Sequence, residues 1–294
     1  MSTYVRPESL DEALALLAGG GAHALAGGTD LVPLQARGKA AGPLVDVRGL
    51  LSDGIEPAGD GIVIGAAARV ADVASDARIA DRYAVLAQAA GQAASPQLRN
   101  QGTVAGNLAQ HVRCWYFRHP DLTCWLNGGD TCYAQIGEHE KHGLEPGDCI
   151  SVAPSDLAGA LLALGARVRV TAVAGQRTLP LEELYARPSE DHRSAVQLAP
   201  GELITAVELP APPDASAYER AGERAAWSFA LTGIAAARFG DDVRLAAIGL
   251  TNEPRLLAPA DPLAGLPGLE QTGWKRELAG VLCERALGRV ARPS

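Results

Sequence analysis

The chain has 294 residues, with 34 acidic side chains against 26 basic ones and a formal net charge of −8 at pH 7. Hydrophobic residues make up 47% and charged residues 20% of it, which is typical of a folded globular protein with room for two compact domains. An acidic surface repels nucleic-acid phosphates and anionic lipid headgroups, so we expect no nucleic acid and no membrane surface as partner. No apolar run reaches the roughly 18–20 residues of a membrane helix.

The first 66 residues predict a small α/β unit. Ser9 and Glu12 form a capping-box pattern, in which Ser9 accepts from the Glu12 amide and Glu12 reaches back to the Ser9 amide. The apolar stretch 13–18 follows acidic residues rather than a basic leader, which predicts a folded helix and no signal peptide. The next expected elements are a strand at 22–26, a helix from Leu31, and strands at 44–47 and 61–66.

The middle of the chain changes in composition. A helix expected over 84–98 leads to a glycine-rich turn, and the segment from His111 to Cys149 then holds four of the six histidines, four of the five cysteines and five aromatic residues. Turn residues dominate it, which predicts a loop-rich insertion. The elements expected beyond it are a helix at 154–166, strands at 167–173, 203–209, 229–239 and 243–250, and a last helix with Leu278, Leu282, Ala286 and Val290 on one face.

Two glycine-rich turns are candidate anion-binding loops. The first is the stretch AGGTDL at 26–31, between a predicted strand and a predicted helix, where backbone can approach a ligand closely and helix-terminal amides favour an anion such as a pyrophosphate. It lacks G-x-G-x-x-G, so we reject a Rossmann site. The second is the stretch GTVAGN at 102–107. Either could be an ordinary turn, but two of them in one α/β region favour a dinucleotide.

Four cysteines, Cys114, Cys124, Cys132 and Cys149, are separated by nine, seven and sixteen residues. Four thiolates suit zinc or an iron–sulfur cluster. Structural zinc usually shows closely spaced cysteine pairs and none occurs here, so the spacing favours a cluster while zinc stays open. Cys283 lies alone on the last predicted helix, where we expect a small core residue.

Three motifs taken together resemble the FAD-binding subunits of the xanthine dehydrogenase and carbon monoxide dehydrogenase family. They are AGGTDL at 26–31, LRNQGTVAGNL at 98–108 and APSDL at 153–157, and their order and spacing match from about residue 4 to residue 250. The segment RCWYFR at 113–118, together with the four clustered cysteines, is similar to a subgroup found in periplasmic aldehyde oxidoreductases and in 4-hydroxybenzoyl-CoA reductase. The flavin subunit of that subgroup carries an extra 4Fe–4S cluster.

The resemblance implies an α+β protein with an FAD-binding fold of the vanillyl-alcohol-oxidase type. Residues 1–175 would form the FAD-binding domain, with two α/β subdomains at about 1–55 and 56–175 and the iron–sulfur insertion at about 110–150. Residues 176–294 would form a C-terminal α+β subdomain. The region after Leu250 is short compared with the family pattern, as if part of this subdomain were deleted.

The resemblance also implies a set of cofactor-binding residues. Backbone amides of the first loop would hold the FAD pyrophosphate, the second loop would contact it from the other side, Asp156 would bind ribose or ribityl hydroxyls, and the strand entry at Leu203 would line the flavin ring. Arg220 stands near the ring, where relatives often carry lysine. The implied FAD residues are Ala26, Gly27, Gly28, Thr29, Asp30, Leu31, Thr103, Gly106, Asn107, Asp156, Leu203 and Arg220. The implied ligands of the 4Fe–4S cluster are Cys114, Cys124, Cys132 and Cys149.

The implied function is electron transfer within a complex. A molybdopterin-binding large subunit would oxidise an organic substrate, a 2Fe–2S small subunit would relay the electrons to FAD in this chain, and an external electron acceptor would receive them. No residue here would be catalytic towards the substrate. The chain carries no address, which favours the cytoplasm, although co-export with a partner would place it in the periplasm. A stand-alone FAD oxidase of the same fold and a zinc-stapled, non-redox assembly module remain alternatives.

Overall fold

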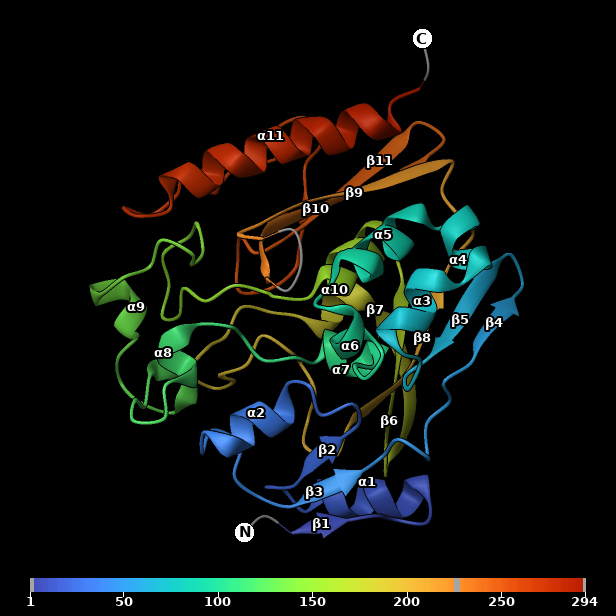
Figure 1. The fold of residues 1–294 in the computed structure, drawn as a ribbon, viewed down its shortest axis with the longest axis vertical. Coiled ribbons are helices and arrows are strands. Elements are labelled where there is room, and N and C mark those ends of the chain that lie inside the picture. The colour runs from blue at the N-terminus through green and yellow to red at the C-terminus, as the bar shows by residue number, and fades with distance from the viewer. Residues whose placement is uncertain (1–2, 225–227, 293–294) are drawn as a thin grey trace.

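A computed structural model describes residues 3–224 and 228–292, which form three sheets arranged along the long axis of the molecule (Figure 1). The first sheet is small and parallel, with strand order β1-β3-β2. Ala13, Leu14 and Leu17 on helix α1 are buried against it. Its elements are β1 (Tyr4–Val5), α1 (Leu10–Ala18), β2 (His23–Leu25), α2 (Leu31–Ala36) and β3 (Leu44–Asp46).

The second sheet has five antiparallel strands in the order β4-β5-β8-β6-β7. Its strands are β4 (Ile55–Ala58), β5 (Gly61–Gly65), β6 (Arg167–Ala172), β7 (Gly175–Pro180) and β8 (Leu203–Leu209). The helices between and beside these strands in the chain are α3 (Val70–Ser75), α4 (Ala77–Arg82), α5 (Ala84–Gln92), α6 (Pro96–Arg99), α7 (Val104–Leu108), α10 (Asp156–Ala163) and η2 (Leu181–Leu184). The expected boundary at residue 175 falls on the first residue of β7, inside this sheet, and the division into domains stays a prediction.

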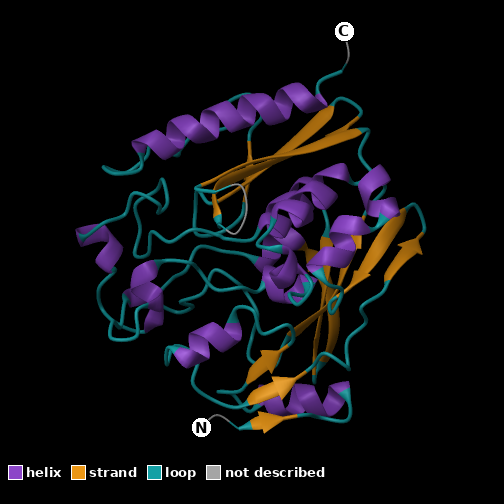
Figure 2. Cartoon of the chain, viewed as in Figure 1, coloured by secondary structure: helices purple, strands orange, loops and turns teal. Residues whose placement is uncertain are grey.

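The third sheet is antiparallel, in the order β12-β11-β10-β9, and one long helix lies beside it (Figures 1 and 2). Its elements are β9 (Ala215–Gly222), β10 (Ala230–Phe239), β11 (Asp242–Ile248), β12 (Arg255–Leu257) and α11 (Gly273–Val290). Leu282, Ala286 and Val290 are buried and Leu278 packs partly buried beside them, which confirms the predicted apolar face. Every residue of α10 is buried, because this helix contacts β10 and β11 as well as α5.

Two local predictions need correction. The helix expected over 84–98 is two helices, because α5 ends at Gln92, Ala94 adopts a positive φ of 49°, and α6 begins at Pro96. Proline disfavours a helical conformation at the preceding residue, and the Ser95 hydroxyl caps the new helix by accepting from the Leu98 amide. In the capping box, Ser9 accepts from the Glu12 amide as predicted, but the Glu12 carboxylate accepts from the Glu8 amide instead of the Ser9 amide.

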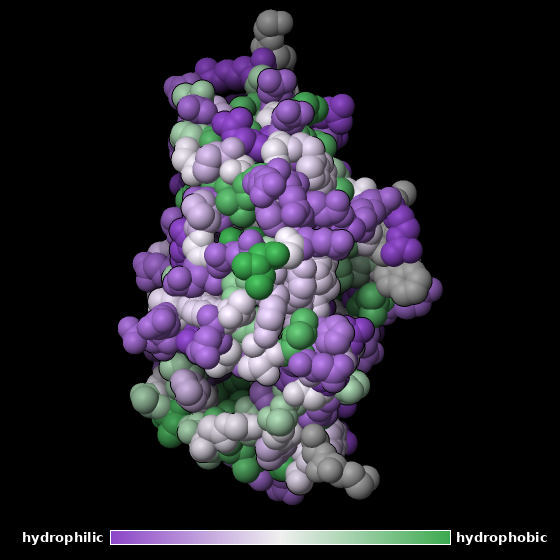
Figure 3. Space-filling model, turned by 90° about the vertical axis from the view of Figure 1, so that its left-hand side faces the viewer, coloured by the Kyte–Doolittle hydropathy of each residue, from purple (hydrophilic) through white to green (hydrophobic). Residues whose placement is uncertain are grey.

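The insertion is loop-rich, as predicted, and lies to one side of the sheets (Figure 2). It contains α8 (Trp115–Arg118), η1 (Trp125–Asn127) and α9 (Tyr133–Ile136). The face on this side is mainly hydrophilic with separate apolar spots (Figure 3). In the part of the chain that the structure describes, no helix combines the length and the hydropathy that crossing a membrane requires.

Candidate flavin groove and cysteine cavity

Three adjoining cavities form a groove that runs from the first glycine loop to the insertion. The glycine-loop cavity, of about 230 Å³, is lined by residues 26–31 and by Thr103 and Gly106. Thr29, Asp30 and these two residues also line a narrower central cavity. The central cavity shares Ala94, Leu98, Arg113, Pro154 and Phe229 with the third and largest one, which we call the large pocket and which has a volume of about 450 Å³.

The two glycine loops touch each other at Gly27. A Cβ atom built on Gly27 would lie 2.1 Å from the carbonyl oxygen of Gln101 and 3.0 Å from the Cα atom of Gly102. Gly28 beside it has a φ of +69°, which residues with a side chain rarely adopt. The sequence AGGTDL therefore allows two backbone segments to approach more closely than any other residue types would permit, and both face the same groove.

The second loop is braced by the APSDL motif. Thr103 caps α7 by accepting from the Gly106 amide at 3.2 Å. The Ser155 hydroxyl caps α10 by accepting from the Ala158 amide, and it donates to the Asn107 side-chain oxygen at 2.6 Å. The start of α10 thus fixes the side chain of Asn107, which lines the central cavity.

Asp156 is buried and already paired. It accepts from the Tyr218 hydroxyl at 2.7 Å and from Arg220 Nε at 2.9 Å. Burial raises the pKa of Asp156, while the Arg220 charge and the hydrogen bond from Tyr218 oppose that rise. Asp156 lines the central cavity, whereas Arg220 is not among the residues that line the three cavities and reaches the groove only through Asp156. Nothing in the sequence pattern pointed to Tyr218.

Leu203 lies apart from the groove. Its side chain is buried in the core cluster that joins α1 to the first sheet, and it does not line any of the three cavities. The structure therefore brings together the predicted residues of the two glycine loops and Asp156, but it does not place Leu203 beside them.

Asp30 connects the first loop to the insertion. Its carboxylate accepts from Arg118 Nη2 at 2.6 Å and from the His111 amide at 2.8 Å, and it lies 2.7 Å from Arg113 Nη1. Burial alone would raise the pKa of Asp30, but the hydrogen bond from His111 and the charges of the two arginines hold it well below its usual range. The side chain of Asp30 is thus engaged by the insertion, and its backbone faces the groove.

The four clustered cysteines line a single small cavity, of about 10 Å³, which is room for about one water molecule. All four are free thiols; Cys124 and Cys149 are buried and the other two half-buried. Cys149 Sγ donates to the Ser151 hydroxyl at 3.1 Å, and the interaction between Cys132 and Cys149 lowers the pKa of Cys132 and raises that of Cys149. Among the residues that the structure describes, no three His, Cys, Asp or Glu side chains are arranged to hold a metal ion. Cys283 is buried in the core beneath α11, as predicted.

Comparison with known proteins identifies the family. Residues 1–212 match the family described as the FAD binding domain in molybdopterin dehydrogenase. The chain belongs to this family. It is 37% identical over 249 residues to the aldehyde oxidoreductase FAD-binding subunit PaoB of Escherichia coli, covering 82% of this chain and 78% of that one. It is 28% identical to the carbon monoxide dehydrogenase medium chain of Afipia carboxidovorans, covering 98% and 96%.

Solved structures confirm the fold of this FAD-binding domain and its continuation to the C-terminus. Carbon monoxide dehydrogenase from Hydrogenophaga pseudoflava superposes with a TM-score of 0.74 at 21% identity, covering 98% of this chain and 96% of that chain. Quinoline 2-oxidoreductase from Pseudomonas putida 86 superposes with a TM-score of 0.70 at 19% identity. The α+β FAD-binding fold that the sequence motifs implied is therefore correct.

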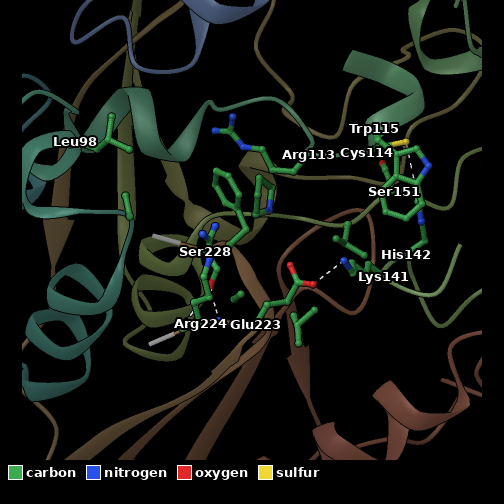
Figure 4. Close-up of a pocket in the computed structure, with 16 residues that line it drawn as sticks. Leu98, Arg113, Cys114, Trp115, Lys141, His142, Ser151, Glu223, Arg224 and Ser228 are labelled. Atoms are coloured by element: carbon green, nitrogen blue, oxygen red, sulfur yellow. Dashed lines mark hydrogen bonds and ion pairs between the residues drawn. The ribbon is translucent and has the colours of Figure 1, made fainter. Parts of the chain in front are cut away.

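Figure 4 shows two of the walls of the large pocket of this FAD-binding domain. Residues 223–224 and 228–229, between β9 and β10, supply one wall, and Lys141 of the insertion forms an ion pair with Glu223 at 2.6 Å. The insertion supplies the other wall, and its lining residues are Arg113, Cys114, Trp115, Lys141 and His142. Burial lowers the pKa of His142 to about 4, and its Nε2 lies 3.2 Å from Cys114 Sγ. Sequence reasoning assigned none of these residues to FAD, and it named Cys114 only as a ligand of the cluster.

Proposed function

We propose that this chain is the FAD-bearing electron-transfer subunit of a molybdenum hydroxylase complex. Its partners are a molybdopterin-binding large subunit and a 2Fe–2S small subunit, and an external acceptor receives the electrons. The names of the relatives support this division of labour, because each names one part of a larger assembly: an aldehyde oxidoreductase FAD-binding subunit, a subunit alpha of the 6-hydroxypseudooxynicotine dehydrogenase complex and a carbon monoxide dehydrogenase medium chain.

The observation that carries the proposal is the continuous groove, because its length and lining suit a dinucleotide. Backbone amides of residues 26–31 and the Thr103, Gly106 and Asn107 positions would hold the pyrophosphate region, and the large pocket would receive the ring. The acidic residues that line the groove are all paired: Asp30 and Asp156 with arginine, and Glu223 in the large pocket with Lys141. A stand-alone oxidase, which needs an acid/base residue facing the flavin, would find no unpaired carboxylate among them. Bound FAD would take up electrons that arrive singly from the 2Fe–2S subunit, store the pair and release it to the external acceptor.

We extend the proposal to a 4Fe–4S cluster at Cys114, Cys124, Cys132 and Cys149. All four thiols already face one cavity, and Cys114 and Ser151 line both that cavity and the large pocket. The cavity is too narrow for a cluster as it stands, so the cysteine loops would have to separate on binding. Short helices and turns carry these cysteines, and such segments move at lower cost than sheet strands.

Metal analysis tests the cluster. Each Cys→Ser change among the four should remove or degrade the iron content and the cluster absorbance of anaerobically prepared protein, whereas the control Cys283→Ser should leave both intact. One equivalent of zinc without iron would favour the zinc-stapled module instead. Iron that survives each of the four single changes would refute the assignment of these ligands.

Reconstitution tests the dependence on partners. The isolated chain should bind FAD but should not oxidise aldehydes, purines or other N-heterocycles, and activity should appear only when the molybdenum and 2Fe–2S subunits are added. Steady turnover of any such substrate by the purified chain with FAD alone would establish the stand-alone oxidase. Fractionation of the native complex would decide between the cytoplasm, which we propose, and the periplasm reached by co-export with a partner.

A further inference from the structure

Arg113 occupies an unusual position between the cysteine insertion and the flavin groove. It directly precedes Cys114, and its side chain lines both the central cavity and the large pocket. In Figure 4 the guanidinium extends from the insertion side of the pocket towards Leu98. Neither sequence motifs nor the family pattern quoted above assign this arginine to FAD.

The guanidinium is held in one orientation by three neighbours. Nη1 lies 2.7 Å from Asp30, Nη2 donates to the Gln110 side chain at 2.7 Å, and the ring of Phe229 stacks on it with 4.3 Å between Cζ and the ring centroid. Nε is buried and has no hydrogen-bond partner among the residues that the structure describes. Phe229 covers the guanidinium but is itself 48% exposed, so it can turn aside and open this donor to a ligand.

The charges around Arg113 leave a surplus of positive charge in the groove. The residues that line the groove carry four positive charges, from Arg99, Arg113, Lys141 and Arg224, and three negative ones, from Asp30, Asp156 and Glu223. Arg118 and Arg220, which pair with Asp30 and Asp156 without lining the cavities, add two more positive charges. In a chain with a net charge of −8, this surplus is a local feature that matches an anionic ligand.

The geometry points to Arg113 as an FAD-binding residue contributed by the insertion. Its unpaired Nε and its charge would contact the flavin where the ring meets the ribityl and pyrophosphate chain, since Arg113 lines the junction of the two cavities. A fixed positive charge there stabilises the reduced flavin, which is the more negative redox state. The inference rests on the proposed function, because it requires that FAD occupies this groove.

A comparison of Arg113→Gln with Arg118→Gln tests the inference. Both changes remove one positive charge and one bond to Asp30, but Arg118 lines none of the three groove cavities. The measurements are the FAD dissociation constant of the deflavinated full chain and the midpoint potential of the bound flavin. We expect Arg113→Gln to weaken FAD binding by roughly ten- to a hundredfold and to lower the midpoint potential, and Arg118→Gln to change affinity by less than about threefold.

The outcomes separate this inference from the proposed function. If the unchanged chain does not bind FAD, the proposed function fails. If it binds FAD and the two variants weaken binding equally, then Arg113 acts only through Asp30 and the inference is wrong. The inference is also wrong if neither variant weakens binding. If Arg113→Gln does not fold, Arg113→Lys decides: it keeps the charge, so it should keep the midpoint potential near that of the unchanged chain while losing affinity. A potential that falls in Arg113→Lys without loss of affinity would overturn the inference.

Discussion

Gly27→Ala should force the two glycine loops apart. The added methyl group would lie 2.1 Å from the Gln101 carbonyl oxygen, more than 1 Å short of ordinary van der Waals contact, which begins near 3.4 Å. The obstructing atom is backbone, so a change of side-chain rotamer cannot relieve the clash. Overpacking of this kind costs about 1–3 kcal/mol. Displacement of one loop also removes amide contacts to an anion, so we expect FAD affinity to fall by roughly ten- to a hundredfold.

The assay for this prediction combines urea unfolding of the FAD-free chain with an FAD titration followed by flavin fluorescence. Gly49→Ala is the matched control, because a Cβ atom on Gly49 meets nothing within 4 Å and its backbone conformation suits any residue. It should change neither stability nor affinity. A Gly27→Ala chain that is as stable as the unchanged chain and binds FAD equally well would show that the loops are not in contact in solution.

Two further predictions concern pH. Asp30→Asn should destabilise the chain at pH 7 by about 3–5 kcal/mol, because it leaves buried arginines unpaired. The folded pKa of Asp30 lies below its unfolded value, so the stability that the carboxylate contributes is lost as pH falls. The difference in unfolding free energy between the variant and the unchanged chain, measured by urea titration, should therefore shrink below about pH 4. Burial lowers the pKa of Lys275 from 10.5 to about 7, so the unfolded chain binds more protons between these values and stability should rise with pH. The unfolding free energy of Lys275→Met should not show that rise between pH 7 and 9.5. The neighbouring His142, with a pKa of about 4, stays neutral throughout this range.

The sequence predicted features that depend on local order along the chain. The glycine turns and the apolar face of the last helix follow from residue types at fixed short spacings, and both are present. The features it missed depend on contacts between distant segments. Asp30 meets residues 111–118 more than 80 positions later, Arg113 stacks on Phe229, and Asp156 pairs with Arg220. A side chain's neutralising partner leaves no periodic signal in sequence, so Asp30 was assigned to the pyrophosphate by its motif alone.

The position of Asp30 shows why the flavin groove and the cysteine insertion are one physical unit. The backbone of Asp30 lies in the loop that touches Gly102 and faces the groove, while its carboxylate holds the two arginines on either side of Cys114–Phe117. Because the Asp30 carboxylate is bonded to both arginines, a shift of one arginine is passed through Asp30 to the other. Any separation of the cysteine loops on cluster binding must therefore act on Arg113, and through it on the wall of the large pocket. Loss of the cluster should consequently weaken FAD binding even though none of the four cysteines lines the glycine-loop cavity.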